Sequence, residues 1–130
     1  MLGLSRLFQS RRSSIHELHE SFRSAIVSFQ DPALAEVFSR AKNGLDNISE
    51  TEQLQFISMV QGIFRVWEDA FHQYNERRLN ERVWKAMIIQ FSGYLSLPGV
   101  QRVWEIRKEA YSEDFRAFVD EVEPREYETH

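Results

Sequence analysis

The chain has no cysteine among its 130 residues. This absence excludes a disulfide framework, a thiol nucleophile and a thiolate metal site, so the fold must rest on packing alone. A chain of this length suits a single domain that buries roughly two-thirds of the surface of its unfolded state. Because no disulfides are needed, we expect a cytoplasmic protein.

Long apolar runs are also missing. No stretch approaches the roughly 18 apolar residues that a membrane-spanning helix needs. The start of the chain, residues 1–8, is too short and too interrupted for the core of a signal peptide. Its mixture of leucine, phenylalanine, serine and arginine suits a membrane interface instead. We therefore expect residues 1–13 to be either a flexible segment or an interfacial one, and the interfacial alternative would place the protein at the periphery of the inner membrane.

Acidic side chains outnumber basic ones outside the N-terminus. The net charge is -4, yet residues 1–14 hold Arg6, Arg11 and Arg12 without any acid. The rest of the chain is therefore more acidic than the whole and would repel a phosphate backbone. We expect no nucleic-acid partner.

Glycine and proline are few, whereas aromatic residues are plentiful, with 10 Phe, 3 Trp and 4 Tyr beside 5 Gly and 3 Pro. This balance is typical of long, aromatic-filled helices with short connections. The clearest helical pattern lies within residues 56–74, where apolar side chains recur every three or four positions. These side chains are Phe56, Val60, Ile63, Trp67, Ala70 and Tyr74. They predict a long central helix from about Glu50 to Arg77, preceded by a capping box at Ser49 and Glu52.

Similar periodicity predicts further helices over residues 14–30, 32–45, 81–95, 98–111 and 113–122. Asp31, Asn80 and Ser112 are the expected N-caps of three of them. No segment alternates as a strand would. We predict an all-α bundle of five or six helices, with one domain over residues 14–122 and a mobile acidic tail over 123–130.

Two histidine-containing groups are candidate metal sites. Glu68 and Asp69 lie four and three residues before His72 on the central helix, but projection places this histidine away from the apolar stripe. A ladder in which Arg65 pairs with Asp69, and Glu68 with His72, accounts for these residues more simply. The second group, residues 16–20, has histidines at 16 and 19 on a polar helix face without a further carboxylate cluster. We expect no metal and no cofactor.

Catalytic motifs are not recognisable. The serines stand mostly at helix caps, and the chain has neither a Gly-x-Ser-x-Gly elbow nor a glycine-rich phosphate loop. We therefore expect a protein that is not an enzyme.

Two residues break the helical patterning. Arg107 projects into an apolar face beside Trp104 and Tyr111, which predicts either a buried ion pair with Glu68 or a side chain whose charged end reaches water. Ile89 points away from the apolar face of its helix. It is a candidate interface residue for a homodimer, although a single exposed isoleucine needs no partner.

Residues 50–122 resemble a family of small, uncharacterised bacterial all-helical proteins, and the likeness rests on aromatic packing positions and helix ends. These are Trp67, Glu68, Tyr74, Trp84, Pro98, Gly99, Trp104, Glu105, Tyr111, Ser112, Phe115, Arg116, Phe118 and Val119. The resemblance implies a helical domain that often follows an N-terminal membrane segment, which this sequence lacks. It implies no particular activity.

The sequence has many residues suited to helix packing and few suited to chemistry at a site. This balance favours a noncatalytic interaction domain with an unidentified protein partner. Weak contacts of its N-terminus would hold the domain near a membrane. The alternative is a protein that binds a small ligand or metal in an aromatic pocket between helices. Trp67, Trp84, Trp104 and Tyr111 are the expected lining of that pocket.

Overall fold

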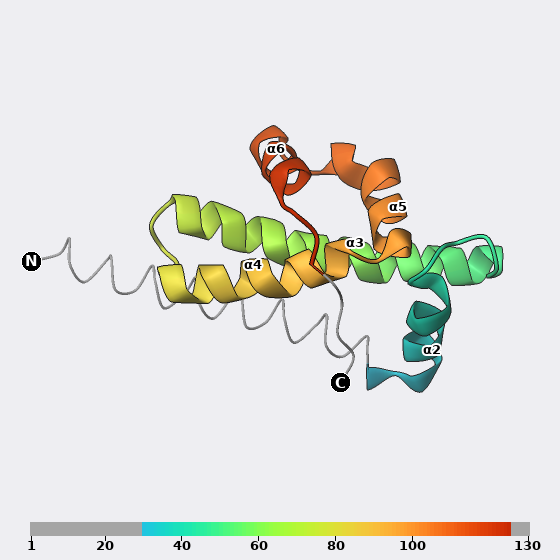
Figure 1. Cartoon of the computed structure of the whole chain (residues 1–130). Helices are drawn as coiled ribbons and strands as arrows, with labels where there is room; N and C mark the ends of the chain where they lie inside the picture. The colour runs from blue at the N-terminus through green and yellow to red at the C-terminus, as the bar shows by residue number, and fades with distance from the viewer. Residues whose placement is uncertain (1–29, 126–130) are drawn as a thin grey trace, which may run out of the picture.

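The computed structural model describes residues 30–125, which are all-α, with no strand among them (Figure 1). The helices are α2 (Pro32–Ala41), α3 (Glu50–Asn75), α4 (Glu81–Leu95), α5 (Pro98–Arg107), the 3-10 turn η1 (Lys108–Ala110) and α6 (Glu113–Glu121). With 26 residues, α3 is the predicted long central helix. The predicted helix over 14–30 lies outside the described residues except for its last position, as do residues 1–13 and 126–130.

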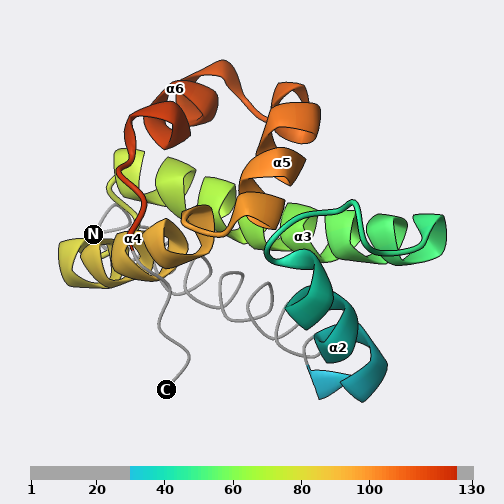
Figure 2. The same ribbon diagram turned by 45° about the vertical axis from the view of Figure 1, so that its right-hand side comes forward.

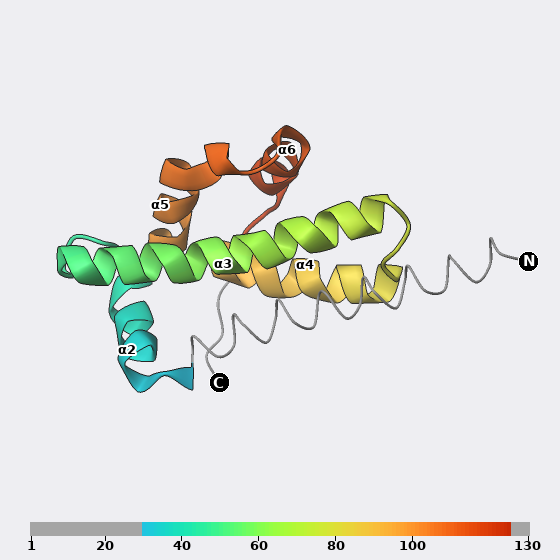
Figure 3. The same ribbon diagram turned by 180° about the vertical axis from the view of Figure 1, so that it is seen from behind.

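The central helix α3 runs along the whole described part, and the other helices are arranged around it (Figure 3). Five of its six predicted stripe residues are buried, and Tyr74 is half-buried. α4 lies antiparallel to α3, as the short connection predicts, while α5 and α6 lie on one side of α3 and α2 on the other (Figures 1 and 2). One contiguous core joins these helices.

The starts of α2, α3 and α4 follow from their capping residues. At α3 the capping box forms in both directions, because the Glu52 N–H donates to Ser49 Oγ at 3.2 Å and the Ser49 N–H donates to Glu52 Oε1 at 3.0 Å. The Asp31 and Asn80 side chains accept from backbone N–H groups in the first turns of α2 and α4. These three helix starts are confirmed.

The end of α2 differs from the prediction, which extended this helix to Leu45. The helix stops at Ala41, and Gly44 follows with φ 150°, a conformation that an L side chain rarely adopts. The start of α5 packs directly on this end. The Gly99 N–H donates to the Lys42 carbonyl at 2.8 Å, and a Cβ on Gly99 would lie 2.0 Å from the Ala41 oxygen.

The predicted helix over 98–111 is also too long. α5 ends at Arg107, the chain tightens into η1, and Tyr111 is extended with ψ 162°. This change of direction brings α6 back over α3. The turn also keeps the start of α5 apart from the end of α6, and a groove lies between these two segments.

None of the helices within residues 30–125 has the length and apolar character needed to span a bilayer.

Candidate functional site

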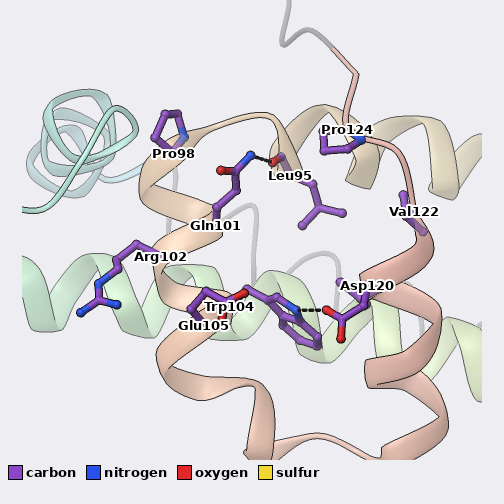
Figure 4. A pocket seen from close by; sticks show the side chains of 10 residues that line it. Leu95, Pro98, Gln101, Arg102, Trp104, Glu105, Asp120, Val122 and Pro124 are labelled. Atoms are coloured by element: carbon purple, nitrogen blue, oxygen red, sulfur yellow. Dashed lines mark hydrogen bonds between the residues drawn. The ribbon is translucent and has the colours of Figure 1, made fainter.

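A groove lies between α5 and the end of α6 (Figure 4). It has a volume of about 500 Å³ and is open to solvent. Its apolar lining consists of Leu95, Pro98, Trp104, Val119, Val122 and Pro124, and its polar rim consists of Gln101, Arg102, Glu105 and Asp120. An apolar floor with a few polar groups is the usual make-up of a binding site of this size.

Hydrogen bonds hold the two walls of the groove in place. The Trp104 indole N–H donates to Asp120 Oδ1 at 2.9 Å, which ties α5 to α6 across the floor (Figure 4). The Gln101 side-chain amide donates to the Leu95 carbonyl at 2.7 Å and secures the start of α5 to the end of α4. Beyond α6, the Arg125 N–H donates to the Ser92 carbonyl at 2.9 Å. The beginning of the predicted tail, residues 123–125, therefore runs back along α4 and completes the second wall.

The charged side chains on the rim are one basic residue, Arg102, and two acidic residues, Glu105 and Asp120. Glu105 forms an ion pair with Lys108 at 3.3 Å, on the exposed side of α5. Asp120 uses one oxygen for the indole and takes part in none of the ion pairs within residues 30–125. Arg102 extends away from Asp120, toward the other side of α5 (Figure 4). The part of the groove beside Trp104 is therefore bordered by carboxylates.

A second polar feature lies where α3 meets the start of α6, centred on the buried carboxylate of Glu68. Its Oε1 accepts from Arg65 Nη1 at 2.6 Å, and its Oε2 accepts from the Ser112 N–H at 2.8 Å. Both oxygens of a buried charge are thus satisfied. The carboxylate also stands at the N-terminal end of α6, where negative charge is stabilising.

The predicted ion pair of Arg107 with Glu68 is wrong. Arg107 is exposed, because α5 ends at this residue and the following 3-10 turn changes the direction of the chain. The interpretation in which its charged end reaches water is the correct one. In the charge ladder predicted along α3, the pairing of Glu68 with His72 is also wrong, since the Glu68 oxygens accept from Arg65 and from the Ser112 N–H and His72 bonds to Ser112.

The hydroxyl of Ser112 does not cap α6, although the residue occupies the predicted N-cap position. It lies 3.1 Å from His72 Nε2 and also bonds to Asp114. This bond from the Ser112 hydroxyl is the main cause that lowers the pKa of Asp114, helped by the Phe115 N–H and by His72.

Tyr111 connects this polar cluster to the core. Its hydroxyl donates to the Gln61 carbonyl at 3.0 Å, and the guanidinium of Arg65 stacks on its ring at 4.5 Å from the centroid. Burial raises the pKa of Tyr111 to about 12, since the phenolate form would lose its solvation. The cluster therefore fixes how α6 docks on α3.

The predicted aromatic pocket is filled by other rings. Trp67 is stacked on Phe91 at 4.9 Å between ring centroids, and Phe115 contacts its edge at 5.7 Å. Trp104 lies 4.8 Å from Phe64, while Phe118 fills the space beside Trp84 at 5.5 Å. All four predicted lining residues are buried in this cluster. The four predicted pocket residues therefore belong to the hydrophobic core. The spacing of aromatic residues along a helix indicates which face is buried, but it does not indicate whether a cavity remains between the helices.

Ile89 is 52% exposed and points outward from α4, as projection predicts. A single exposed isoleucine is ordinary on a protein surface. The homodimer remains a prediction, which a sedimentation mass that stays monomeric at high concentration would contradict.

The described residues 30–125 contain no group of three or more histidine, aspartate or glutamate side chains arranged to hold a metal ion. Glu68, Asp69 and His72 are included in this range. The second candidate, at residues 16–20, lies outside it.

Sequence reasoning missed the groove, although it identified most of the helices that form it. Trp104 was expected to line the aromatic pocket, whereas it is buried in the core and its indole N–H donates to Asp120 on another helix. The signal that could have found this bond was the polar atom of the buried tryptophan, which needs a hydrogen-bond partner.

No protein-family model, curated protein or solved structure matches this chain. The resemblance to small bacterial helical proteins therefore remains a prediction.

Proposed function

We propose that this chain is a noncatalytic helical interaction domain, located in a bacterial cytoplasm at the periphery of the inner membrane. The observation that supports the proposal is the open groove between α5 and the end of α6. Its floor is apolar, its rim is polar, and its walls are held by the hydrogen bonds of Trp104 and Gln101. Such a surface is preorganised, so a partner does not have to order it on binding.

The surrounding structure fits a binding role better than a chemical one. The buried polar cluster of Glu68 and Ser112 ties α6 to α3 and uses its groups for internal hydrogen bonds. The aromatic rings fill the core between the same helices. The groove is instead open to solvent, which makes it available to another molecule.

Site-specific photo-crosslinking in the source cell tests this proposal. A photoreactive amino acid replaces Pro124, which is exposed at the margin of the groove, or, as a matched control, Lys85 on the exposed face of α4. We expect a discrete crosslinked protein from position 124 that is missing from position 85. Identical crosslinking patterns from both positions, or no discrete product from position 124, would contradict a binding role for the groove.

A further inference from the structure

The groove between α5 and the α6–Pro124 segment combines an apolar floor with carboxylates on both walls. We propose that it binds a short peptide stretch in which a lysine or arginine stands next to an apolar side chain. This inference rests on the proposed function and names the chemistry of the partner.

The floor selects an apolar side chain. Leu95, Val119 and the indole of Trp104 are buried beneath the groove, and Pro98 and Pro124 stand exposed at its margins. A volume of about 500 Å³ lies within the roughly 300–1,000 Å³ typical of ligand sites. Placing one or two apolar side chains there removes their surface from water, and this burial supplies most of the binding free energy.

The walls select the sign of the partner's charge. Asp120 is held in place by the indole N–H of Trp104 at 2.9 Å, and a carboxylate can accept further hydrogen bonds beyond this one. Glu105 faces the groove from α5, and its ion pair with Lys108 is an exposed one at 3.3 Å. A cationic side chain lying over Trp104 would meet both carboxylates.

The single basic residue on the rim does not reverse this preference. Arg102 extends to the far side of α5, away from Asp120 (Figure 4). Next to the lining residues of the second wall in sequence, Glu121 and Glu123 are acidic and Arg125 is basic, and all three are exposed, so this segment has a net negative charge. Because exposed ion pairs contribute only about 0–1 kcal/mol each, we expect the carboxylates to decide between peptides more than they raise affinity.

The three tryptophans provide built-in reporters for the test. The Trp104 indole N–H lies at the groove, bonded to Asp120, whereas the indole nitrogen of Trp67 is buried without a hydrogen-bond partner in the described core. In an NMR titration of the full chain, the Trp104 indole resonance should therefore respond to binding and that of Trp67 should not.

The probes are two synthetic peptides with the same central Leu-Val pair, flanked by lysines in one and by glutamates in the other. We expect the lysine peptide to shift the Trp104 resonance to saturation and the glutamate peptide to bind at least tenfold more weakly. Higher salt should weaken binding of the lysine peptide. Equal binding of the two peptides, or no shift of Trp104 with either, would overturn the inference.

A double substitution tests the carboxylates directly. Glu105→Gln with Asp120→Asn removes both charges while the asparagine oxygen can still accept from Trp104. We expect at least fivefold weaker binding of the lysine peptide. The matched control, Glu36→Gln with Glu109→Gln, removes two exposed charges elsewhere and should bind as the unmodified chain does. Unchanged binding by the groove variant would overturn the inference.

The two proposals fail in different ways. If position 124 crosslinks a discrete protein and the Glu105→Gln/Asp120→Asn variant retains that product in full, the groove binds a partner but the charge selection is wrong. If position 124 gives no discrete product, the proposed function itself is wrong.

Discussion

Glu68 shows how one buried charge can determine the packing of two helices. Its side chain is 8% exposed, and its two oxygens bond to Arg65 on the same helix and to the Ser112 N–H at the start of α6. Removing a carboxylate from water is costly unless its lone pairs are satisfied. The docked position of α6 satisfies them, so the charge favours this position over others.

We predict that Glu68→Gln lowers the free energy of unfolding by about 2 kcal/mol, the range of hydrogen bonds to charged groups. Glutamine has one acceptor oxygen, so its amide NH₂ must face either the guanidinium or the Ser112 N–H. Urea denaturation followed by circular dichroism measures the change. Glu109→Gln, at an exposed position, should stay within about 0.5 kcal/mol of the unmodified chain. Equal effects of the two substitutions would contradict this role of Glu68.

Tyr111 makes a pH-dependent contribution to stability. Its pKa is raised from 10.0 to about 12 in the folded protein, mainly by burial. Between these values the unfolded chain loses the phenolic proton while the folded chain keeps it, so stability falls as pH rises. The contribution is complete below pH 10 and is lost as pH approaches the folded pKa.

We therefore predict that the unmodified chain loses more stability than Tyr111→Phe between about pH 9 and about pH 11. Phenylalanine has no proton to lose, so the variant retains only the pH dependence of the other groups. Denaturation at each pH measures this difference, and a phenolate absorbance titration should show a component of high pKa that Tyr111→Phe lacks. Parallel pH profiles for the two proteins would rule out the proposed contribution.

At the scale of single residues, the sequence predicted burial better than it predicted partners. Helical periodicity correctly assigned the stripe of α3, because burial depends on which face a residue occupies. One of its two interpretations of Arg107 paired this residue with Glu68, whereas the true partners of Glu68 are Arg65 and the backbone of Ser112. A partner from another helix depends on where the intervening chain turns, and the turn after α5 left no periodic signal.

At the scale of helices, starts were predicted more accurately than ends. Capping residues at Asp31, Ser49 and Asn80 bond to groups two or three residues away, so local sequence is sufficient to identify them. The end of α2 at Ala41 instead depends on contact with α5, far along the chain. Local periodicity does not report such a contact.

The contact between α2 and α5 gives a prediction for this scale. Gly99→Ala would place a Cβ 2.0 Å from the Ala41 oxygen, so the start of α5 must move away from α2 and weaken the bond to the Lys42 carbonyl. We expect a loss of about 2 kcal/mol, typical of overpacking. Chemical denaturation measures this loss.

Gly62→Ala is the matched control, because this glycine lies within α3 and a Cβ there meets nothing within 4 Å. Alanine is a better helix former, so we expect a gain of about 0.5–1 kcal/mol. The two glycine substitutions should thus have opposite signs. A neutral or stabilising effect of Gly99→Ala would show that the close approach of the two helices is not required.

At the scale of the whole molecule, the sequence predicted the all-α class and the central helix but not the groove. The class follows from periodicity, which every helix repeats. The groove depends on the angle between α5 and α6, which is set by the 3-10 turn and by the bond from Trp104 to Asp120. Neither feature has a periodic signature, so the groove could not be predicted from the pattern that predicted the fold.

The proposed membrane location gives a prediction for the complete chain. The basic residues of the N-terminus, Arg6, Arg11 and Arg12, are not accompanied by acids within residues 1–14, whereas the rest of the chain is acidic. Each arginine near an anionic lipid surface contributes about 1 kcal/mol, and the neighbouring leucine and phenylalanine side chains can add interfacial contacts. We expect the full chain to float with vesicles that contain anionic lipid and to be released by high salt.

Replacing the three arginines by glutamine should abolish this flotation without changing the length of the chain, and a variant that lacks residues 1–12 should behave in the same way. Vesicles of neutral lipid provide the second comparison, because they retain the interfacial contacts but not the charge attraction. Failure of the unmodified chain to float with anionic vesicles would contradict the membrane location. Equal flotation of the glutamine variant would assign the membrane contact to a different part of the protein.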